Sequence, residues 1–220
     1  KAAKETMSAE SYAQEFECSF QAGISGSYFG KIMEELEQKG NIKSFDIDED
    51  LEVETWWDLG MNDSTVITFA QRHNDEIRII DCYENSGEGL EHYLNVIDDK
   101  GYTYSKHIAP HDIRVREIGT NKSRWETAKE LGLEFDIAPK LSIEDGIEQV
   151  RRMLPNCYFH KNNCKKLIEA LKSYCKRWDE KNNCFRNKPL HNWSSHFCDS
   201  IRYGAMSNSN PSSFAVSHLD

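Results

Sequence analysis

VETWWDLG, residues 53 to 60, is a mostly apolar run in which Asp58 comes just before the break at Gly60. Its β-branched and aromatic residues predict a buried strand. A carboxylate at the end of such a strand is unfavourable unless it is paired or binds a metal ion. The alternative is an Asp that caps the following turn, and the local sequence supports both interpretations equally.

This strand is the first of three β-rich runs that are separated by short turns, the others being 65 to 72 and 76 to 83. Runs with this spacing predict an antiparallel meander. Helical and strand-like patterns then alternate. The expected elements are a helix closed by Gly101, a strand at 105 to 109, a helix opened by a capping box at 123 to 126, a strand at 135 to 138, a helix between Ser142 and Pro155, a short strand at 157 to 159 and a helix around Leu167. The order predicts an α/β fold with a mixed sheet, in which an antiparallel meander is followed by parallel strands and helices lie on both faces.

The segments that flank this pattern are more polar. A helix capped by Ser27 precedes an acidic stretch, 41 to 52, which is expected to be a linker. Residues 174 to 190 are polar and basic and predict a hairpin or flap, and the last helix begins near Ser194. The predicted parts of the chain are an N-terminal segment (1 to 45), a main domain (46 to 208) and a disordered tail (209 to 220).

The composition is that of a globular protein, since 38% of the 220 residues are hydrophobic. No stretch approaches the roughly 20 apolar residues that a membrane-spanning helix needs. The N-terminal residues lack the apolar region of a signal peptide. Because the first residue is Lys, we expect the chain to be a fragment of a longer protein. Seven scattered cysteines do not resemble a disulfide framework and favour a reducing compartment.

Cys157, His160 and Cys164 could form a zinc site, but their spacing matches no regular zinc pattern. Cys164 also precedes Leu167 and Leu171 at helical spacing, which predicts a position in the core. We favour the core position.

The net charge of −10 argues against strong DNA binding by this chain alone, because affinity for nucleic acid comes mostly from Lys and Arg that face phosphates. Acidic residues concentrate at 46 to 54 and 84 to 99. The basic clusters lie elsewhere, at 114 to 124, 161 to 166, 172 to 177 and 186 to 188. We therefore expect a locally basic face, and we expect a partner domain to supply most of the affinity for DNA.

A second candidate carboxylate is Asp112, which follows the predicted strand at 105 to 109. Ligands collect at strand ends in α/β sheets, although Asp112 could equally be a turn residue. His111 is expected to face solvent. Asp63 more simply begins a turn.

A third candidate is Asp199 on the last predicted helix, where it shares a face with His196 and Tyr203. A His one turn from an Asp could position a water or stabilise charge on a leaving oxygen. A solvated polar face is the alternative. The core-facing side of the same helix is expected to be Trp193, Phe197, Ile201 and Ala205.

Carboxylates at positions 58, 112 and 199 would suit Mg²⁺ or Mn²⁺ if folding draws them together. Two such ions ~3.5–4 Å apart can activate a water and stabilise the leaving oxygen of a phosphodiester. Other chemistries are disfavoured. No G-x-x-x-x-G-K-[ST] loop is present, so the chain is no ATPase by itself, and Ser194 and Ser195 lack the strained turn of a serine nucleophile.

Three elements occur in order: D-L-G-x-x-D at 58 to 63, P-H-D at 110 to 112 and H-N-W-S-S-H-x-x-D-x-x-R-Y at 191 to 203. Together they resemble the C-terminal nuclease domain of the large terminase subunit of tailed bacteriophages. The resemblance runs from about residue 15 to about residue 205. The segment at 15 to 20 looks like the one that joins the packaging ATPase to its nuclease.

This resemblance implies a ribonuclease H-like fold and metal-dependent cleavage of concatemeric double-stranded DNA at the start and end of genome packaging. By resemblance, Asp58, Asp112 and Asp199 match the metal-binding acids, and His196 matches a histidine beside the last acid. Two divalent ions, Mg²⁺ or Mn²⁺, are implied. The implied partners are double-stranded DNA, the ATPase domain of the same polypeptide, the portal protein and the small terminase subunit. They would meet in the host cell cytoplasm, without a membrane, and residues 174 to 190 would form a β-hairpin near the site.

Under this hypothesis Asp58 bridges the two ions, whereas Asp112 and Asp199 hold one each. Two alternatives remain open. One is another ribonuclease H-like nuclease of the resolvase or transposase type. The other is a module that docks DNA or the motor without cutting.

Overall fold

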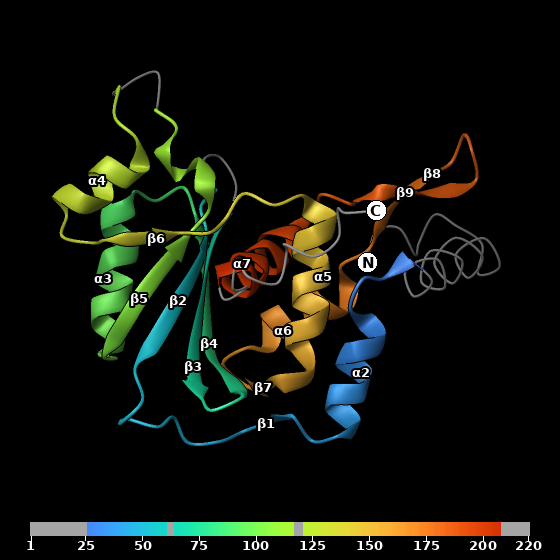
Figure 1. Ribbon diagram of the computed structural model, residues 1–220, viewed down its shortest axis with the longest axis horizontal. Coiled ribbons are helices and arrows are strands. Elements are labelled where there is room, and N and C mark those ends of the chain that lie inside the picture. Colours follow the sequence, from blue (N-terminus) through green and yellow to red (C-terminus); the bar gives the residue numbers. More distant parts are fainter. Residues whose placement is uncertain (1–25, 61–63, 117–120, 208–220) are drawn as a thin grey trace, which may run out of the picture.

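A seven-stranded mixed sheet lies at the centre of the protein, in the order β1-β7-β4-β3-β2-β5-β6 (Figure 1). The structure, a computed structural model, describes residues 26–60, 64–116 and 121–207. The strands of the sheet are β1 (Ile42–Lys43), β2 (Val53–Asp58), β3 (Ser64–His73), β4 (Glu76–Ser86), β5 (Tyr104–Ala109), β6 (Phe135–Ile137) and β7 (Cys157–His160).

The pairing of these strands confirms the predicted mixed sheet. β2, β3 and β4 form the antiparallel meander. β5 and β6 then add in parallel beside β2, and β7 and β1 add in parallel beside β4. Parallel strands therefore extend the meander on both sides, and β2 ends inside the sheet, between β3 and β5.

The acidic stretch expected to be a linker contains β1, so this expectation was wrong for residues 42 and 43. These residues pair with Phe159 and His160 of β7. The neighbouring Asn41 donates from Nδ2 to the carbonyl of Cys157 at 3.0 Å. The strand is only two residues long, and long-range backbone pairing rather than any local pattern holds it in place.

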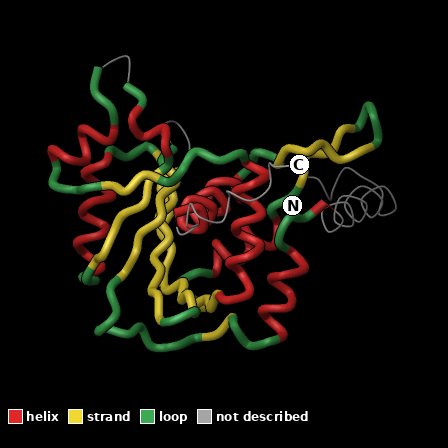
Figure 2. Tube along the Cα trace, viewed as in Figure 1, coloured by secondary structure: helices red, strands yellow, loops and turns green. Residues whose placement is uncertain are grey.

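Helices cover both faces of the sheet, as predicted (Figures 1 and 2). α3 and α4 lie on one face, and α2, α5, α6 and α7 lie on the other. The helices are α2 (Gly30–Gln38), α3 (Leu90–Lys100), α4 (Arg124–Glu130), α5 (Ile143–Met153), α6 (Lys165–Ser173) and α7 (Trp193–Ser207), with 3₁₀ turns η2 (His111–Arg114) and η3 (Leu154–Asn156). Residues 174 to 190 form the expected hairpin, built from β8 (Lys176–Asp179) and β9 (Cys184–Pro189), which projects from the body (Figure 2).

Local signals explain where α4 begins. Ser123 is its N-cap, and the Ser123 hydroxyl accepts from the backbone N–H of Glu126 at 3.2 Å. Glu126 in return accepts from the backbone N–H of Ser123 at 2.8 Å. This reciprocal pair is the capping box that the sequence predicts.

β2 is buried on both faces. The alternation of its side chains between these faces determines the direction of Asp58. Val53 and Trp57 belong to the core beneath α3 and α4. Trp56 belongs to the core beneath α5, α6 and α7. Side chains alternate along a strand, so Asp58 falls on the same side as Trp56 and faces α7.

α7 lies directly on the sheet because Gly204 has no side chain. A β-carbon at Gly204 would lie 2.0 Å from the indole of Trp56, a distance no packed structure tolerates. The hydroxyls of Ser200 and Thr68 add a contact of 2.8 Å between α7 and β3. The predicted core face of α7 is confirmed at Phe197, Ile201 and Ala205. The expectation was wrong for Trp193, which is 45% exposed because it is the first residue of the helix and extends beyond the sheet.

Cys164 occupies the core, as the helical spacing predicts. It is fully buried at the N-terminus of α6, and its thiol lies 3.4 Å from the carbonyl of Ile79. Burial raises the pKa of this thiol well above its ordinary value. Within the three described ranges, no helix combines the length and apolarity needed to cross a membrane.

Candidate active site

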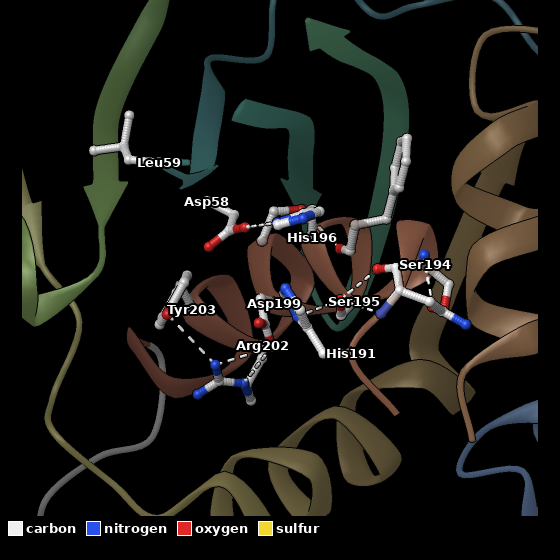
Figure 3. Close-up of polar contacts among 12 residues, drawn as sticks. Asp58, Leu59, His191, Ser194, Ser195, His196, Asp199, Arg202 and Tyr203 are labelled. Carbon is white, nitrogen blue, oxygen red and sulfur yellow. Dashed lines mark hydrogen bonds and ion pairs between the residues drawn. The ribbon is translucent and has the colours of Figure 1, made fainter. Parts of the chain in front are cut away.

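Asp58 and His196 meet where the end of β2 faces α7 (Figure 3). Nδ1 of His196 lies 3.0 Å from Oδ2 of Asp58, although 138 positions separate the two residues in the chain. Both side chains are only 14% exposed. The close packing of α7 against Trp56 brings the Asp58 and His196 side chains together.

Asp58 is a carboxylate in an unfavourable environment. Burial raises the pKa of Asp58 to about 6, and the negative charge of Asp199 adds to the shift. The hydrogen bond to His196 and the charge of Arg202 oppose it. The charged form of Asp58 is therefore disfavoured by burial and by a like charge, a condition that a bound cation would relieve.

Asp199 lies on α7, one turn after His196, as Figure 3 shows. Its Oδ1 accepts hydrogen bonds from Nε and Nη2 of Arg202, at 3.1 and 2.9 Å. The Asp199 side chain is 27% exposed, whereas that of Arg202 is only 10% exposed. Asp199 is thus held by an internal cation and still reaches the surface.

Asp112 approaches from a different element. It lies in the 3₁₀ turn η2 directly after β5 and is exposed. Its charge acts on the phenol of Tyr203. Burial raises the pKa of that phenol, Arg202 lowers it, and Asp199, Asp58 and Asp112 raise it further. The charges of all three predicted carboxylates therefore act on one side chain of α7.

The three acids do not form a finished metal site. Among the described residues, no three His, Cys, Asp or Glu side chains are close enough together to hold one ion. The chemistry of the donors nevertheless fits Mg²⁺ or Mn²⁺, which prefer carboxylate oxygens. The charge of Asp199 acts on Asp58, and the three acids would have to move closer together to share ions. The assignment of the three as ligands stays a prediction.

Other sequence expectations fall into place around this centre. His111 is exposed, as expected. Asp63 lies outside the described residues. The hydroxyls of Ser194 and Ser195 donate to Asn192, just before α7, at 2.7 and 2.5 Å, and the Ser195 hydroxyl also lies 3.1 Å from Nδ1 of His191.

The sequence reasoning did not predict the contacts of two cationic residues. Arg202 forms an i,i+3 pair with Asp199, a spacing that could have revealed it. Arg124 donates from Nη1 to the carbonyl of Leu59 at 2.7 Å and so fixes the backbone just after Asp58. No local pattern could have shown this contact, because it joins α4 to a residue 65 positions earlier.

Comparisons with known proteins place these features in context. No protein-family model matches the chain. The chain is 26% identical over 216 residues to the terminase large subunit of Escherichia phage T5, an alignment that covers 93% of this chain and 47% of the T5 protein. The chain thus spans about half the length of that relative.

Solved structures show a similar fold. The large terminase nuclease domain of bacteriophage SPP1 with bound Mn gives a TM-score of 0.52 at 16% identity, covering 69% of this chain and 84% of that one. The large terminase nuclease of the thermophilic phage G20c with bound magnesium gives 0.55 at 12% identity, covering 82% of this chain and 96% of that one. The ribonuclease H-like fold and the resemblance to the nuclease domain of large terminase subunits are therefore confirmed.

Proposed function

We propose that this chain is the nuclease part of a large terminase subunit, a metal-dependent endonuclease that cuts concatemeric double-stranded viral DNA during genome packaging into procapsids. One observation carries the proposal. A buried carboxylate at the end of a central strand, Asp58, contacts His196 on α7 and is acted on by the charge of Asp199 on the same helix, in a chain similar to terminase proteins. The segment of 1 to 45 would lead from an ATPase domain of the same polypeptide, and 46 to 208 would be the nuclease domain.

Asp58, Asp112 and Asp199 are the proposed ligands of two divalent ions, Mg²⁺ or Mn²⁺, which would supply the positive charge needed to activate water and stabilise the leaving oxygen of a phosphodiester. The protein's own part is to position its groups. His196 holds Oδ2 of Asp58 at 3.0 Å. Arg124 fixes the peptide that follows Asp58. Burial excludes most water from the Asp58 carboxylate, whereas Asp112 is exposed.

Double-stranded DNA is the proposed substrate, and it would approach past two groups of arginine residues. Arg114 and Arg116 lie at and just after η2, beside Asp112. Arg177 and Arg186 lie on the β8–β9 hairpin. With a net charge of −10, the chain by itself should hold DNA weakly. The ATPase domain, the portal protein and the small terminase subunit would supply the remaining contacts in the host cytoplasm.

The direct test is cleavage of plasmid and linear duplex DNA in Mn²⁺ or Mg²⁺. We expect Asp58→Ala, Asp112→Ala and Asp199→Ala each to abolish cutting while circular dichroism shows an intact fold. Asp99→Ala is a matched control, because Asp99 is an exposed acid near the end of α3, on the other face of the sheet. The proposal is wrong if all three site variants still cut. A strong preference for four-way junctions would favour a resolvase-type nuclease instead.

One observation favours a second candidate, a docking module that no longer cuts. The described residues contain no three His, Cys, Asp or Glu side chains gathered around one position. Calorimetry with Mn²⁺ separates the two functions. The nuclease should bind Mn²⁺ in a manner that Asp58→Asn abolishes, whereas a docking module should show no binding that depends on Asp58.

A further inference from the structure

Arg202 is a buried cation on the helix that carries the candidate site. Its guanidinium donates from both Nε and Nη2 to the same oxygen of Asp199, Oδ1. Within the described residues, Oδ2 of Asp199 receives no hydrogen bond. One oxygen of this carboxylate is therefore held twice, and the other is left for a ligand.

The position of the guanidinium is fixed on several sides. Its Cζ lies 4.7 Å from the ring centre of Tyr203, and Nη2 lies 3.4 Å from the Tyr203 hydroxyl. Nη1 lies 3.9 Å from the sulfur of Met206. Few other orientations of Arg202 could be accommodated here, so the direction of the Asp199 carboxylate is fixed with it.

A glycine of α5 completes the space that holds the Arg202 side chain. A β-carbon at Gly146 would lie 2.6 Å from Cδ of Arg202 and 3.0 Å from the sulfur of Met206. Any other residue at position 146 would displace the arginine side chain. The fold thus contains a space shaped for Arg202, contributed by a helix that carries none of the candidate ligands.

The guanidinium fork of Arg202 does more than neutralise charge, because two of its N–H groups converge on one carboxylate oxygen and so fix the position of that oxygen. Residues that orient a metal ligand in this way change metal affinity by about 10–100-fold when they are replaced. A Lys at the same position would keep the charge but lose the fork. The two roles can therefore be separated by substitution.

We propose that Arg202 is a positioning residue, which holds Oδ1 of Asp199 (Figure 3) and leaves Oδ2 to bind a cation near Asp58. The inference rests on the proposed function, since it takes Asp199 to be a metal ligand. Arg202 itself touches neither the ion nor the DNA. Its effect passes entirely through the orientation of Asp199.

The test is Mn²⁺ calorimetry on the complete chain, combined with thermal melts followed by circular dichroism without metal. Arg202→Lys and Arg202→Met should both weaken Mn²⁺ binding by about 10–100-fold. Gly146→Ala should weaken it in the same direction, because Arg202 is kept but displaced. The matched control is Arg152→Lys, since Arg152 is a 68% exposed residue of α5 that pairs with Glu148 and should leave Mn²⁺ binding unchanged.

A role in charge alone predicts a different pattern. Arg202→Lys would then bind Mn²⁺ like the parent chain, and Arg202→Met would bind it more tightly, since a repelling cation is gone. Either result overturns the proposal. Should Arg202→Met fail to fold, Arg202→Lys and Gly146→Ala decide by the same criterion. If the parent chain binds no Mn²⁺ that Asp199→Asn abolishes, the proposed function itself fails, which is a separate and recognisable outcome.

Discussion

β2 carries two buried carboxylates on one face, and these two side chains have different partners and different neighbouring charges. Glu54, near the start of the strand, is 8% exposed at its side chain. Its Oε1 lies 2.8 Å from Nε of Arg72 and 3.2 Å from Nζ of Lys106, and its Oε2 accepts from the indole of Trp56. Asp58, four residues later, has His196 as its one hydrogen-bonding partner within the described residues, and the like charge of Asp199 acts on it.

This contrast separates an acid that the fold neutralises from the candidate site acid. Burial is similar for the two residues, so burial alone does not mark a site. The difference lies in the neighbouring charge. Glu54 is matched by two cations, whereas Asp58 forms a hydrogen bond only with His196 within the described residues and is acted on by the like charge of Asp199. An acid that the fold does not satisfy internally is the better candidate for a ligand.

The largest expected effect is on stability at the satisfied end of the strand. Glu54→Ala removes the partner of Arg72, Lys106 and Trp56, and breaking a buried ion pair in this way costs about 3–5 kcal/mol. Urea unfolding of the metal-free chain measures this loss. Glu52→Ala, an exposed acid just before β2, is the control and should change little. A loss below about 1 kcal/mol for Glu54→Ala would mean that the network is weak.

At the other end of β2 the expected change has the opposite sign. Asp58→Asn removes a buried charge but keeps an oxygen for His196. In the absence of metal, at pH 8, we expect a gain in unfolding free energy on the order of 1–3 kcal/mol, since burial raises the pKa of Asp58 to about 6. The same urea titration measures the gain. A variant as damaged as Glu54→Ala would show that the two carboxylates are alike after all.

The pH dependence sharpens the second expectation. The ordinary pKa of Asp58 is 3.8 and the folded value is about 6, so the folded protein binds the proton more tightly than the unfolded chain. Metal-free stability contributed by this group is therefore present below about pH 4 and is lost as pH rises through about 6. The stability difference between Asp58→Asn and the parent should grow across this window and then stay constant.

His107 makes the comparison with the variant necessary. Burial lowers the pKa of His107 to about 4, so the folded protein loses stability from this group as pH falls below its ordinary value of 6.5. Parent and variant share that loss, which cancels in the difference. A difference that does not change between pH 4 and 7 would contradict the raised pKa of Asp58.

The smallest expected effect concerns the hydrogen bond that Asp58 does have. His196→Ala removes it, which should lower stability by about 1 kcal/mol above pH 6. Because this bond lowers the pKa of Asp58, its loss should also move the midpoint of the pH window upward. Urea titrations repeated across that window measure both changes. His73→Ala, an exposed residue at the end of β3, should leave the midpoint in place.

The sequence allowed much of the fold to be predicted because local signals agree with it. The meander follows from β-rich runs with short turns, and α4 begins at the capping box of Ser123 and Glu126. β1 was missed because two residues carry no periodicity, and their place depends on β7, more than 100 residues later. Trp193 was misplaced because a helical wheel does not show where the sheet ends.

The candidate site was predictable only as separate pieces. Asp58 stands out as an acid in an apolar run, and His196 and Asp199 share a helix face. That the pieces meet depends on Gly204 and Trp56, whose close packing no pattern in either segment reveals. The partners of Glu54 come from β3 and β5, so the sequence could not tell which acid of β2 the fold would neutralise.

The missing side chain at Gly204 has a mechanical consequence. Because the backbone of α7 lies against the Trp56 indole at Gly204, the helix has no space to move closer to the sheet. The helix is a rigid support, and His196 and Asp199 are fixed to it. Any closing of the site around a substrate must then come from the facing rim, where Asp112 lies on a four-residue turn. For the proposed nuclease, control would accordingly be exerted by contacts on that turn.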